Sequence, residues 1–167
     1  MMKIYTKTGD GGMTGTMRGR MQKSDQLAKA IGSIDELNSW VGMCRYKTPL
    51  EAELKRIQTD LFVIASGLAG SGKKLSYSEI RRLEKLIDKL SGELPKLSNF
   101  IYPVGELQVV RAVCRRAERE IVNLSVTNGN MVNQNILKYM NRLSDALFVM
   151  ARWVNFKKDG EEEVWRG

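Results

Sequence analysis

Apolar residues recur at helical spacing along five stretches of the chain, and this pattern predicts five helices. In the first stretch the apolar positions fall three or four residues apart, and they mark the side expected to be buried: Leu27, Ile31, Ile34, Leu37, Val41 and Cys44. The predicted helices span Ser24 or Asp25 to Tyr46, Thr48 to Ala69, Ser76 to Gly92, a stretch after Pro103 that ends before the turn Thr127–Asn130, and Met131 to Phe156. Five helices with short connections and no convincing strand predict an all-α, up-and-down five-helix bundle.

Two of these helices carry recognisable start signals. Thr48 is a suitable N-cap, Pro49 suits the first helical position, and Glu51 completes a capping box. Ser76 and Glu79 repeat the capping pattern before the third helix. We therefore expect the second and third helices to begin at these residues.

The fourth helix carries a row of arginines beside its apolar side. Arg111, Arg115 and Arg119 recur every fourth residue, and the apolar positions between Val110 and Leu124 lie on a different stripe. Like charges at this spacing repel one another by roughly a few tenths of a kcal/mol per pair, so the row needs anionic partners. Two interpretations stay open at this point: an exposed face threaded with salt bridges, or a binding site for a polyphosphate.

An acidic residue in the first helix could pair with this row. Asp35 lies beside the apolar stripe, in a segment that also contains Gly32. Glycine inside a helix costs roughly 1 kcal/mol relative to alanine, which suggests that something packs closely at this position. Asp35 is either a surface acid at the edge of the core or a carboxylate paired with one of the arginines of the fourth helix.

The stretch from Thr6 to Gly15 is rich in glycine and hydroxyl residues, and we expect it to form neither a stable helix nor a regular strand. Its backbone N–H groups could converge on an anion, with Lys7 as a further donor. Arg18, Arg20 and Lys23 extend the positive charge. The alternative is a mobile N-terminus without a ligand.

A second glycine-rich stretch, Gly67 to Lys73, has the spacing of a phosphate-binding P-loop. Lys74 stands where the motif requires Ser or Thr, and the preceding residues have helical rather than strand periodicity. We therefore interpret it as a solvated turn between two helices.

Composition narrows the possible chemistry. The chain of 167 residues is expected to form one domain, with an N-terminal loop (1–23), a helical bundle (24–156) and a frayed tail (157–167), of which Trp165 could be docked. It contains no histidine, which excludes His-based triads, His metal sites and imidazole acid–base steps. The net charge of +8 points to an acidic partner. Neither a membrane span nor a signal-peptide core is recognisable, and Cys44 and Cys114 read as buried thiols, so a cytoplasmic location is expected.

Three separated stretches together resemble one family. They are Tyr5–Thr14, Gly32–Asn38, and Arg115–Arg119 with Asn141–Asp145. In this order they look like the signatures of the PduO-type ATP:cob(I)alamin adenosyltransferases, and the resemblance covers nearly the whole chain. It implies a homotrimer of five-helix bundles with each active site between two subunits, ATP and Mg²⁺ as well as cobalamin as ligands, and a flavin-type reductase as a possible partner.

The resemblance also implies roles for individual residues in the nucleotide site. An N-terminal set would wrap ATP: Thr6, Lys7, Thr8, Gly9, Thr14 and Gly15. Lys23 would reach the phosphates, and Arg115 and Arg119 would contact the triphosphate. Arg116 would complete the pocket, with Glu118 and Asn141 on the ribose or adenine side. No metal ligand is expected from the protein, because Mg²⁺ would sit on the phosphates.

For the corrinoid, the resemblance implies that Asp35 pairs with Arg111 across a subunit boundary and that Phe100 lies under the corrin ring, where it keeps the lower axial ligand off cobalt. The family's Pro-Gly-Gly turn is replaced here by Pro103-Val104-Gly105, and the segment from Phe100 to Arg111 is shorter than usual.

Two other functions are compatible with the sequence. The shortened segment favours a regulatory bundle that binds ATP without catalysis, and the positive charge permits a helical protein that binds nucleic acid. Basic residues spread over several helices and interleaved with acids argue against the second, as does an aromatic fraction of 7%. We therefore expect neither nucleic acid nor a membrane as a partner.

Overall fold

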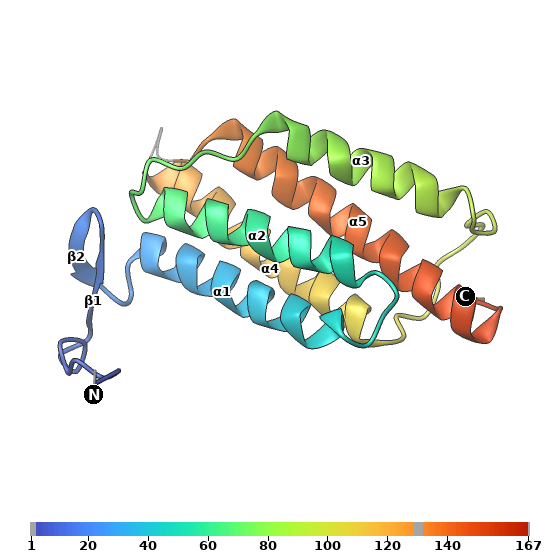
Figure 1. The fold of residues 1–167 in the computed structure, drawn as a ribbon, viewed down its shortest axis with the longest axis horizontal. Helices are drawn as coiled ribbons and strands as arrows, with labels where there is room; N and C mark the ends of the chain where they lie inside the picture. Colours follow the sequence, from blue (N-terminus) through green and yellow to red (C-terminus); the bar gives the residue numbers. More distant parts are fainter. Residues whose placement is uncertain (1–2, 129–131, 167) are drawn as a thin grey trace.

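The computed structural model describes residues 3–128 and 132–166, which form a five-helix bundle with a small hairpin at one end (Figure 1). In chain order the elements are β1 (Met13–Thr16), β2 (Gly19–Gln22), α1 (Gln26–Arg45), α2 (Glu51–Leu68), α3 (Tyr77–Ser91), α4 (Glu106–Thr127) and α5 (Gln134–Asp159). Successive helices alternate in direction, so the predicted up-and-down bundle is confirmed (Figure 1). In the part of the chain described, no helix is both long and apolar enough to cross a membrane.

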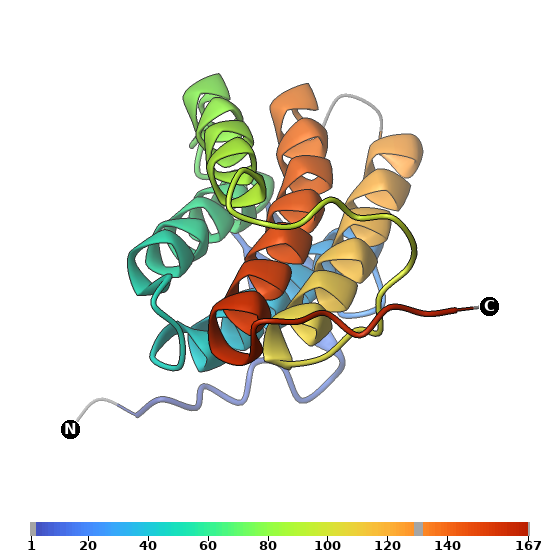
Figure 2. The same cartoon turned by 90° about the vertical axis from the view of Figure 1, so that its right-hand side faces the viewer.

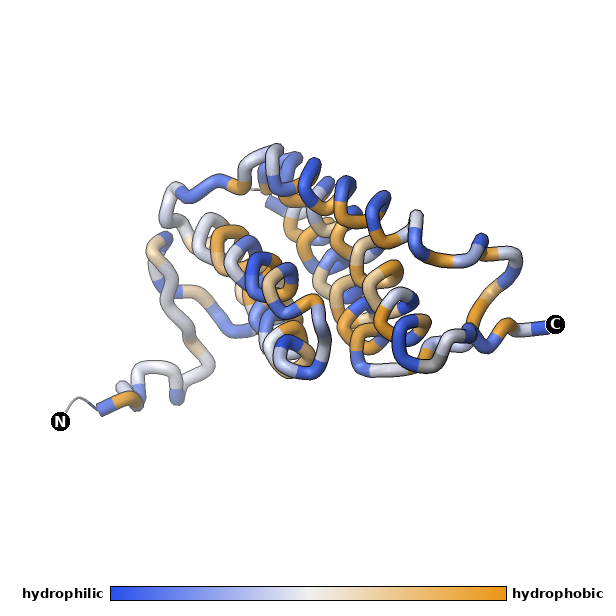
Figure 3. Tube along the Cα trace, turned by 45° about the vertical axis from the view of Figure 1, so that its right-hand side comes forward, coloured by the Kyte–Doolittle hydropathy of each residue, from blue (hydrophilic) through white to orange (hydrophobic). Residues whose placement is uncertain are grey.

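The packing order around the bundle differs from the order along the chain. Helix α1 packs on α2 and α4, and α5 packs on α3 and α4, as the end view shows (Figure 2). Apolar segments turn inward on all five helices (Figure 3). The apolar stripe predicted for α4 is fully confirmed, because every one of its positions is buried: Val110, Val113, Cys114, Ala117, Ile121 and Leu124.

A polar cluster crosses this core between α2, α3 and α5. Asp60 is 5% exposed and accepts hydrogen bonds from Arg82 Nη2 at 2.6 Å and from the Tyr139 hydroxyl at 2.8 Å. Arg82 also donates to Glu79 and Glu53, each at 2.9 Å. Burial raises the pKa of the Asp60 carboxyl above its usual value and raises that of the Tyr139 phenol well above its usual value. The cluster is fully partnered, which identifies it as part of the framework that holds three helices together.

The two predicted capping signals have different outcomes. Ser76 caps α3 as expected, because its hydroxyl accepts a hydrogen bond from the Ser78 N–H at 3.2 Å. The prediction for α2 is wrong: Leu50 occupies the N-cap position, and Thr48 Oγ1 accepts from the Leu50 N–H at 3.3 Å in a turn before the helix. This turn buries Leu50 to 9% exposure, and packing of that side chain outweighs the capping box.

The expectation that residues 6–15 contain no regular strand is also wrong. Met13–Thr16 pairs antiparallel with Gly19–Gln22. Gly19 has a φ of +117° after the turn, which favours glycine. The hairpin is held to the bundle by Arg18 Nε, which donates to the Leu68 carbonyl at the end of α2 at 2.9 Å.

The turn predicted after α2 is confirmed, because a helix rather than a strand precedes Gly70 and Gly72, both with positive φ. Gly129 and Asn130 of the predicted turn Thr127–Asn130 lie outside the described residues, as does Met131. Helix α5 is described from Gln134 and continues past the predicted end at Phe156.

The C-terminal tail is paired rather than frayed. An isolated antiparallel bridge joins Ile101 and Val164, and the Trp165 N–H donates to the Phe100 carbonyl at 2.8 Å. The docking of Trp165 is therefore confirmed. The tail and the segment before α4 lie at the end of the bundle opposite the hairpin (Figure 1).

Candidate functional site

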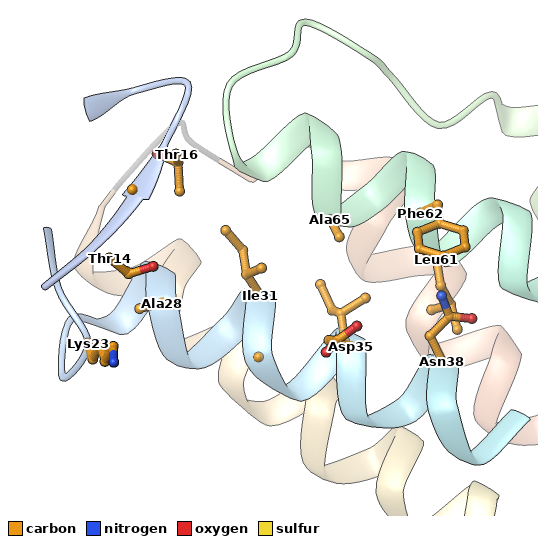
Figure 4. A pocket seen from close by; sticks show the side chains of 13 residues that line it. Thr14, Thr16, Lys23, Ala28, Ile31, Asp35, Asn38, Leu61, Phe62 and Ala65 are labelled. Atoms are coloured by element: carbon orange, nitrogen blue, oxygen red, sulfur yellow. The ribbon is translucent and has the colours of Figure 1, made fainter. Parts of the chain in front are cut away.

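A cleft of about 440 Å³ opens between the hairpin, α1 and α2 (Figure 4). Four of the site residues expected from the sequence line it: Thr14, Gly15, Lys23 and Asp35. The remaining wall is mostly apolar and comes from α1 and α2: Ala28, Ile31, Ile34, Leu61, Phe62 and Ala65. Ile31 was expected in the core and is instead half-buried at this cleft. The cleft thus combines an apolar wall with polar groups at the hairpin.

The glycine-rich segment before the hairpin is tied to it through hydrogen bonds. Lys23 Nζ donates to the Gly9 carbonyl at 3.1 Å, and Arg20 Nη2 donates to the Thr8 carbonyl at 2.5 Å. The hydroxyls of Thr6 and Thr8 lie 2.9 Å apart. Lys7 has a φ of +58°, a left-handed conformation that is strained for a residue with a Cβ. Strain of this kind is concentrated at binding sites, and here it falls inside the stretch expected to wrap a nucleotide.

Three further residues of the cleft, Gly15, Gly32 and Asn38, either leave open space or carry a polar atom without a hydrogen-bond partner among the described residues. A Cβ on Gly15 or on Gly32 would meet no heavy atom within 4 Å, so these glycines keep the cleft open. Gly32 therefore does not mark close packing within this chain, as its sequence position suggested. Asn38 is 5% exposed, and its Oδ1 has no hydrogen-bond partner among the described residues. Buried polar atoms are normally paired, so an unpartnered one in a cleft wall favours a binding role.

The arginines of α4, a helix that packs against α1, differ in their partners. Arg116 forms an ion pair with Glu36 of α1, and Arg111 Nε donates to Gln108 at 2.8 Å. Arg115 and Arg119 are exposed, and among residues 3–128 and 132–166 neither forms an ion pair. The row is therefore not neutralised by neighbouring carboxylates, which favours the second of the two interpretations left open by the sequence.

Next to this row, α4 and α5 place two of the expected nucleotide residues together. Asn141 Nδ2 donates to Glu118 Oε1 at 3.4 Å. Asp145, one turn beyond Asn141, is instead paired with Arg142 at 3.0 Å. Glu118 and Asn141 thus form one polar pair beside Arg115, and Asp145 belongs to a different surface network.

The expected site residues consequently fall on separate surfaces of one chain. No residue of α4 or α5 lines the cleft that contains Lys23 and Asp35. The acid of α1 that contacts α4 within this chain is Glu36, not Asp35. Asp35 is exposed and faces the cleft (Figure 4). One copy of the chain therefore presents two separate groups of expected site residues, which we call half-sites.

Phe100 lies on neither half-site. It is 75% exposed, in the segment between α3 and α4 that pairs with the C-terminal tail. Its ring makes an edge-to-face contact with Trp165, with the centroids 6.3 Å apart and the planes inclined at 64°. The pairing of the tail with residues 100–102 thus leaves the Phe100 side chain exposed.

Potential metal ligands do not gather in the part of the chain described: no group of three or more His, Cys, Asp or Glu side chains is placed to hold an ion. The site as a whole offers guanidinium, ammonium, hydroxyl and amide groups, which suit an anionic ligand more than a protein-bound metal.

Sequence reasoning assigned no role to several residues that the structure brings to these sites. Phe62 is 64% exposed on α2, and Thr16 and Asn38 line the same cleft. An aromatic residue one position off the apolar stripe of a helix was the available signal for Phe62.

Comparison with known proteins gives a consistent result. The sequence model of the cobalamin adenosyltransferase family matches residues 4–154. The chain is 39% identical over 170 residues to a corrinoid adenosyltransferase of Bacillus subtilis, covering 92% of this chain and 87% of that protein. It is 39% identical over 184 residues to the corrinoid adenosyltransferase MMAB of Homo sapiens, covering 98% and 73%. A variant PduO-type ATP:corrinoid adenosyltransferase from Lactobacillus reuteri, complexed with cobalamin and ATP, superimposes with a TM-score of 0.91 at 34% identity, covering 99% of this chain and 100% of that one.

Proposed function

Because the chain belongs to the cobalamin adenosyltransferase family, we propose that it transfers the 5′-deoxyadenosyl group of ATP to the cobalt of reduced cob(I)alamin and releases triphosphate. The observation that carries this proposal is that Arg115 and Arg119 are exposed on α4 and form no ion pair among the described residues. Guanidinium groups in this state are ready to bind the oxygens of a polyphosphate.

The chemistry suits a chain without histidine. Co(I) supplies the electron pair that forms the cobalt–carbon bond, and the bond between the ribose 5′ carbon and the triphosphate oxygen breaks. No proton has to be removed, so no general base is needed. The protein has to align the carbon with cobalt, stabilise the charge that develops on the leaving triphosphate, and exclude water.

For the nucleotide we assign two groups of residues. Lys23 and the segment Thr6–Gly9 hold the phosphates from the hairpin side, and Arg115 and Arg119 hold them from α4. Arg116 completes the α4 side, although its ion pair with Glu36 reduces its availability. The pair Glu118–Asn141 offers both an acceptor and a donor beside the arginines, which is what a ribose hydroxyl or an adenine edge requires.

The separation of the half-sites supports a site shared between subunits. We propose a homotrimer in which the cleft of one subunit, with Thr14, Gly15 and Asp35, faces α4 of its neighbour. Asp35 would then pair with Arg111 of that neighbour beside the corrinoid. Phe100 would occupy the lower face of cobalt, and removal of the lower ligand makes Co(II) easier to reduce.

Several finer assignments belong to the same proposal. Mg²⁺ accompanies ATP on its phosphates, a flavin-type reductase supplies the electron for Co(II), and residues 1–167 act as one domain. A reducing, cytoplasmic location is supported by the two free cysteines, Cys44 and Cys114, which are both buried.

The visible spectrum of cobalamin provides the direct test. Reduced cobalamin mixed with the protein, ATP and Mg²⁺ should convert to the spectrum of the alkylated product. Binding of ATP without that change would support the regulatory bundle instead. A nucleic-acid-binding protein would show no change and would bind RNA or DNA with a steep salt dependence.

Mixed oligomers test the shared site. Asp35→Ala disables the cleft half and Arg115→Ala disables the α4 half, so each variant alone should be inactive. When the two are refolded together, a subunit with an intact cleft can face a neighbour with an intact α4, and random mixing restores about one quarter of the sites. If the site lay within a single subunit, mixing would restore no activity.

A further inference from the structure

The C-terminal tail is connected to the segment that carries Phe100 by backbone hydrogen bonds. The Tyr102 N–H donates to the Glu163 carbonyl at 3.0 Å, and the Trp165 N–H donates to the Phe100 carbonyl at 2.8 Å. Ile101 and Val164 form the bridge between these two bonds. Two bonds and one bridge make a very short antiparallel pairing, which is marginal without other support.

That support comes from a buried ion pair on α5. Arg152 donates to both carboxylate oxygens of Glu162, from Nε and from Nη2, each at 2.7 Å. The two side chains are only 7% and 10% exposed. Two parallel bonds between a planar guanidinium and a carboxylate fix the orientation of both groups as well as their separation.

Arg152 also holds the other partner of the pairing. Its Nη2 donates to the Pro95 carbonyl at 3.0 Å, in the linker that leads from α3 to Phe100. A single guanidinium on α5 therefore donates hydrogen bonds to both the tail and the linker. Glu162 directly precedes the paired tail residues 163–165, and Pro95 lies in the same linker as residues 100–102.

Phe100 has few other restraints. Its side chain is 75% exposed, so core packing contributes little to its position. Beyond the bond to Trp165, its own N–H donates to Asn99 Oδ1 at 2.9 Å, which is a local contact within the same linker. The edge-to-face contact with Trp165 is again a contact with the tail.

We propose that the ion pair between Arg152 and Glu162 positions Phe100 for the corrinoid by clamping the C-terminal tail and the α3–α4 linker to α5. Arg152 and Glu162 are positioning residues, because they act through the tail and touch no substrate themselves. The proposal rests on the proposed function for the role of Phe100, but the clamp is a property of this chain's own contacts. Its effect should be confined to the cobalt side of the reaction.

Glu162→Ala tests the clamp, and hydrogen exchange gives a readout independent of activity. With the ion pair gone, the tail is held only by the short pairing, so exchange at the N–H groups of Tyr102 and Trp165 should accelerate about tenfold or more. Amides in the middle of α4 and α5 should keep their wild-type exchange rates.

The catalytic readout separates positioning from general damage. In the presence of ATP, Glu162→Ala should lose most of the spectral change that accompanies removal of the lower ligand from Co(II)cobalamin. Turnover that starts from Co(II) with a weak reductant should fall about tenfold, while turnover of chemically prereduced cob(I)alamin and the affinity for ATP should stay within about twofold of wild type.

Arg152→Lys serves as the second variant, because it keeps the buried positive charge and the fold. A lysine cannot make two parallel bonds to Glu162 and a third to Pro95, so an intermediate effect on exchange and on the Co(II) spectrum is expected. Lys157→Met is the matched control. It removes an ion pair to Glu93 at 3.0 Å, also between α5 and the α3–α4 linker but half-exposed and away from the tail, and both readouts should stay unchanged.

The outcomes separate the inference from the proposed function. Unchanged exchange at Tyr102 and Trp165 in Glu162→Ala would overturn the clamp. Faster exchange with a wild-type Co(II) spectrum would show that the tail is clamped without positioning Phe100, which also overturns the inference and leaves the proposed function intact. Wild-type protein that fails to alkylate cob(I)alamin would instead overturn the proposed function, while the exchange result would still judge the clamp.

Discussion

Arg82 on α3 and Arg115 on α4 carry the same side chain in opposite surroundings. Arg82 is largely buried, with its side chain 16% exposed, and donates to three carboxylates, those of Glu53, Asp60 and Glu79. Arg115 is exposed and has no ion pair among the residues that the structure describes. A largely buried arginine whose three nitrogens each donate to a carboxylate holds the fold together, whereas exposed arginines without an ion pair among the described residues are available to a ligand. The comparison assigns stability to the first and nucleotide binding to the second.

The largest expected effect comes from replacing Arg82, the arginine assigned to stability. Arg82→Met should lower the free energy of unfolding by about 3–5 kcal/mol, because it leaves the buried Asp60 carboxylate without its cation. Chemical denaturation followed by circular dichroism measures the loss. Arg56→Ala is the control, since Arg56 contacts Glu79 from a side chain that is 58% exposed and should cost about 1 kcal/mol or less. Equal losses in the two variants would contradict a framework role for Arg82.

The second prediction concerns Arg115, the arginine assigned to nucleotide binding. Arg115→Ala should reduce turnover about 100- to 1000-fold, which corresponds to about 2.7–4 kcal/mol of lost stabilisation of the leaving triphosphate, and should weaken ATP binding severely. Its unfolding free energy should stay within about 0.5 kcal/mol of wild type, since the exposed side chain makes no ion pair with the residues that the structure describes. Wild-type affinity for ATP in this variant would refute the assignment.

A pH titration tests the contribution of the polar cluster around Arg82 to stability, through the phenol of Tyr139. Burial raises the pKa of the Tyr139 phenol well above its usual value, whereas in the unfolded chain it ionises near pH 10. The stabilising contribution is therefore fully present below about pH 10 and is lost as the pH rises further, because only the unfolded state releases the proton. Tyr139→Phe should cost about 1–3 kcal/mol at pH 7 and should show a shallower loss of stability above pH 10 than wild type. Parallel curves for the two proteins above pH 10 would contradict this account.

The smallest effect concerns Arg116, the neighbour of Arg115. Its guanidinium is already paired with Glu36, and both side chains are about half-exposed, 49% and 44%. Glu36→Gln should change the unfolding free energy by about 1 kcal/mol or less, and it should leave ATP affinity unchanged or slightly improved because Arg116 is released. Isothermal titration with ATP distinguishes this from a large loss, which would mean that Glu36 itself belongs to the site.

The sequence predicted the helices well because their apolar stripes directly specify which face is buried. The stripe of α4 from Val110 to Leu124 is an example, since the packing of one face decides the element. The hairpin escaped this reasoning because each strand has only 4 residues and neither contains a buried one. It depends on a contact distant in the chain, from Arg18 to the carbonyl of Leu68, which no local pattern reveals.

The sequence indicates which residues belong to the candidate site but not how they are arranged in space. The arginine row from Arg111 to Arg119 follows from helical spacing alone, but the lack of ion pairs to it among the described residues depends on how α1 and α4 pack. Glu36 rather than Asp35 reaches α4 within this chain, although the two residues are adjacent. The clamp between Arg152 and Glu162 gave no signal, because a ten-residue separation across a helix end has no characteristic spacing.

Binding of inorganic triphosphate tests the central claim most directly, because it removes the adenosyl group and cobalamin from the question. In isothermal titration with Mg²⁺ present, triphosphate should bind the wild-type protein, compete with ATP, and lose at least about tenfold in affinity in Arg115→Ala, with Lys157→Met unchanged. Equal triphosphate affinity in wild type and Arg115→Ala would contradict the claim that the unpaired arginines of α4 hold the phosphates.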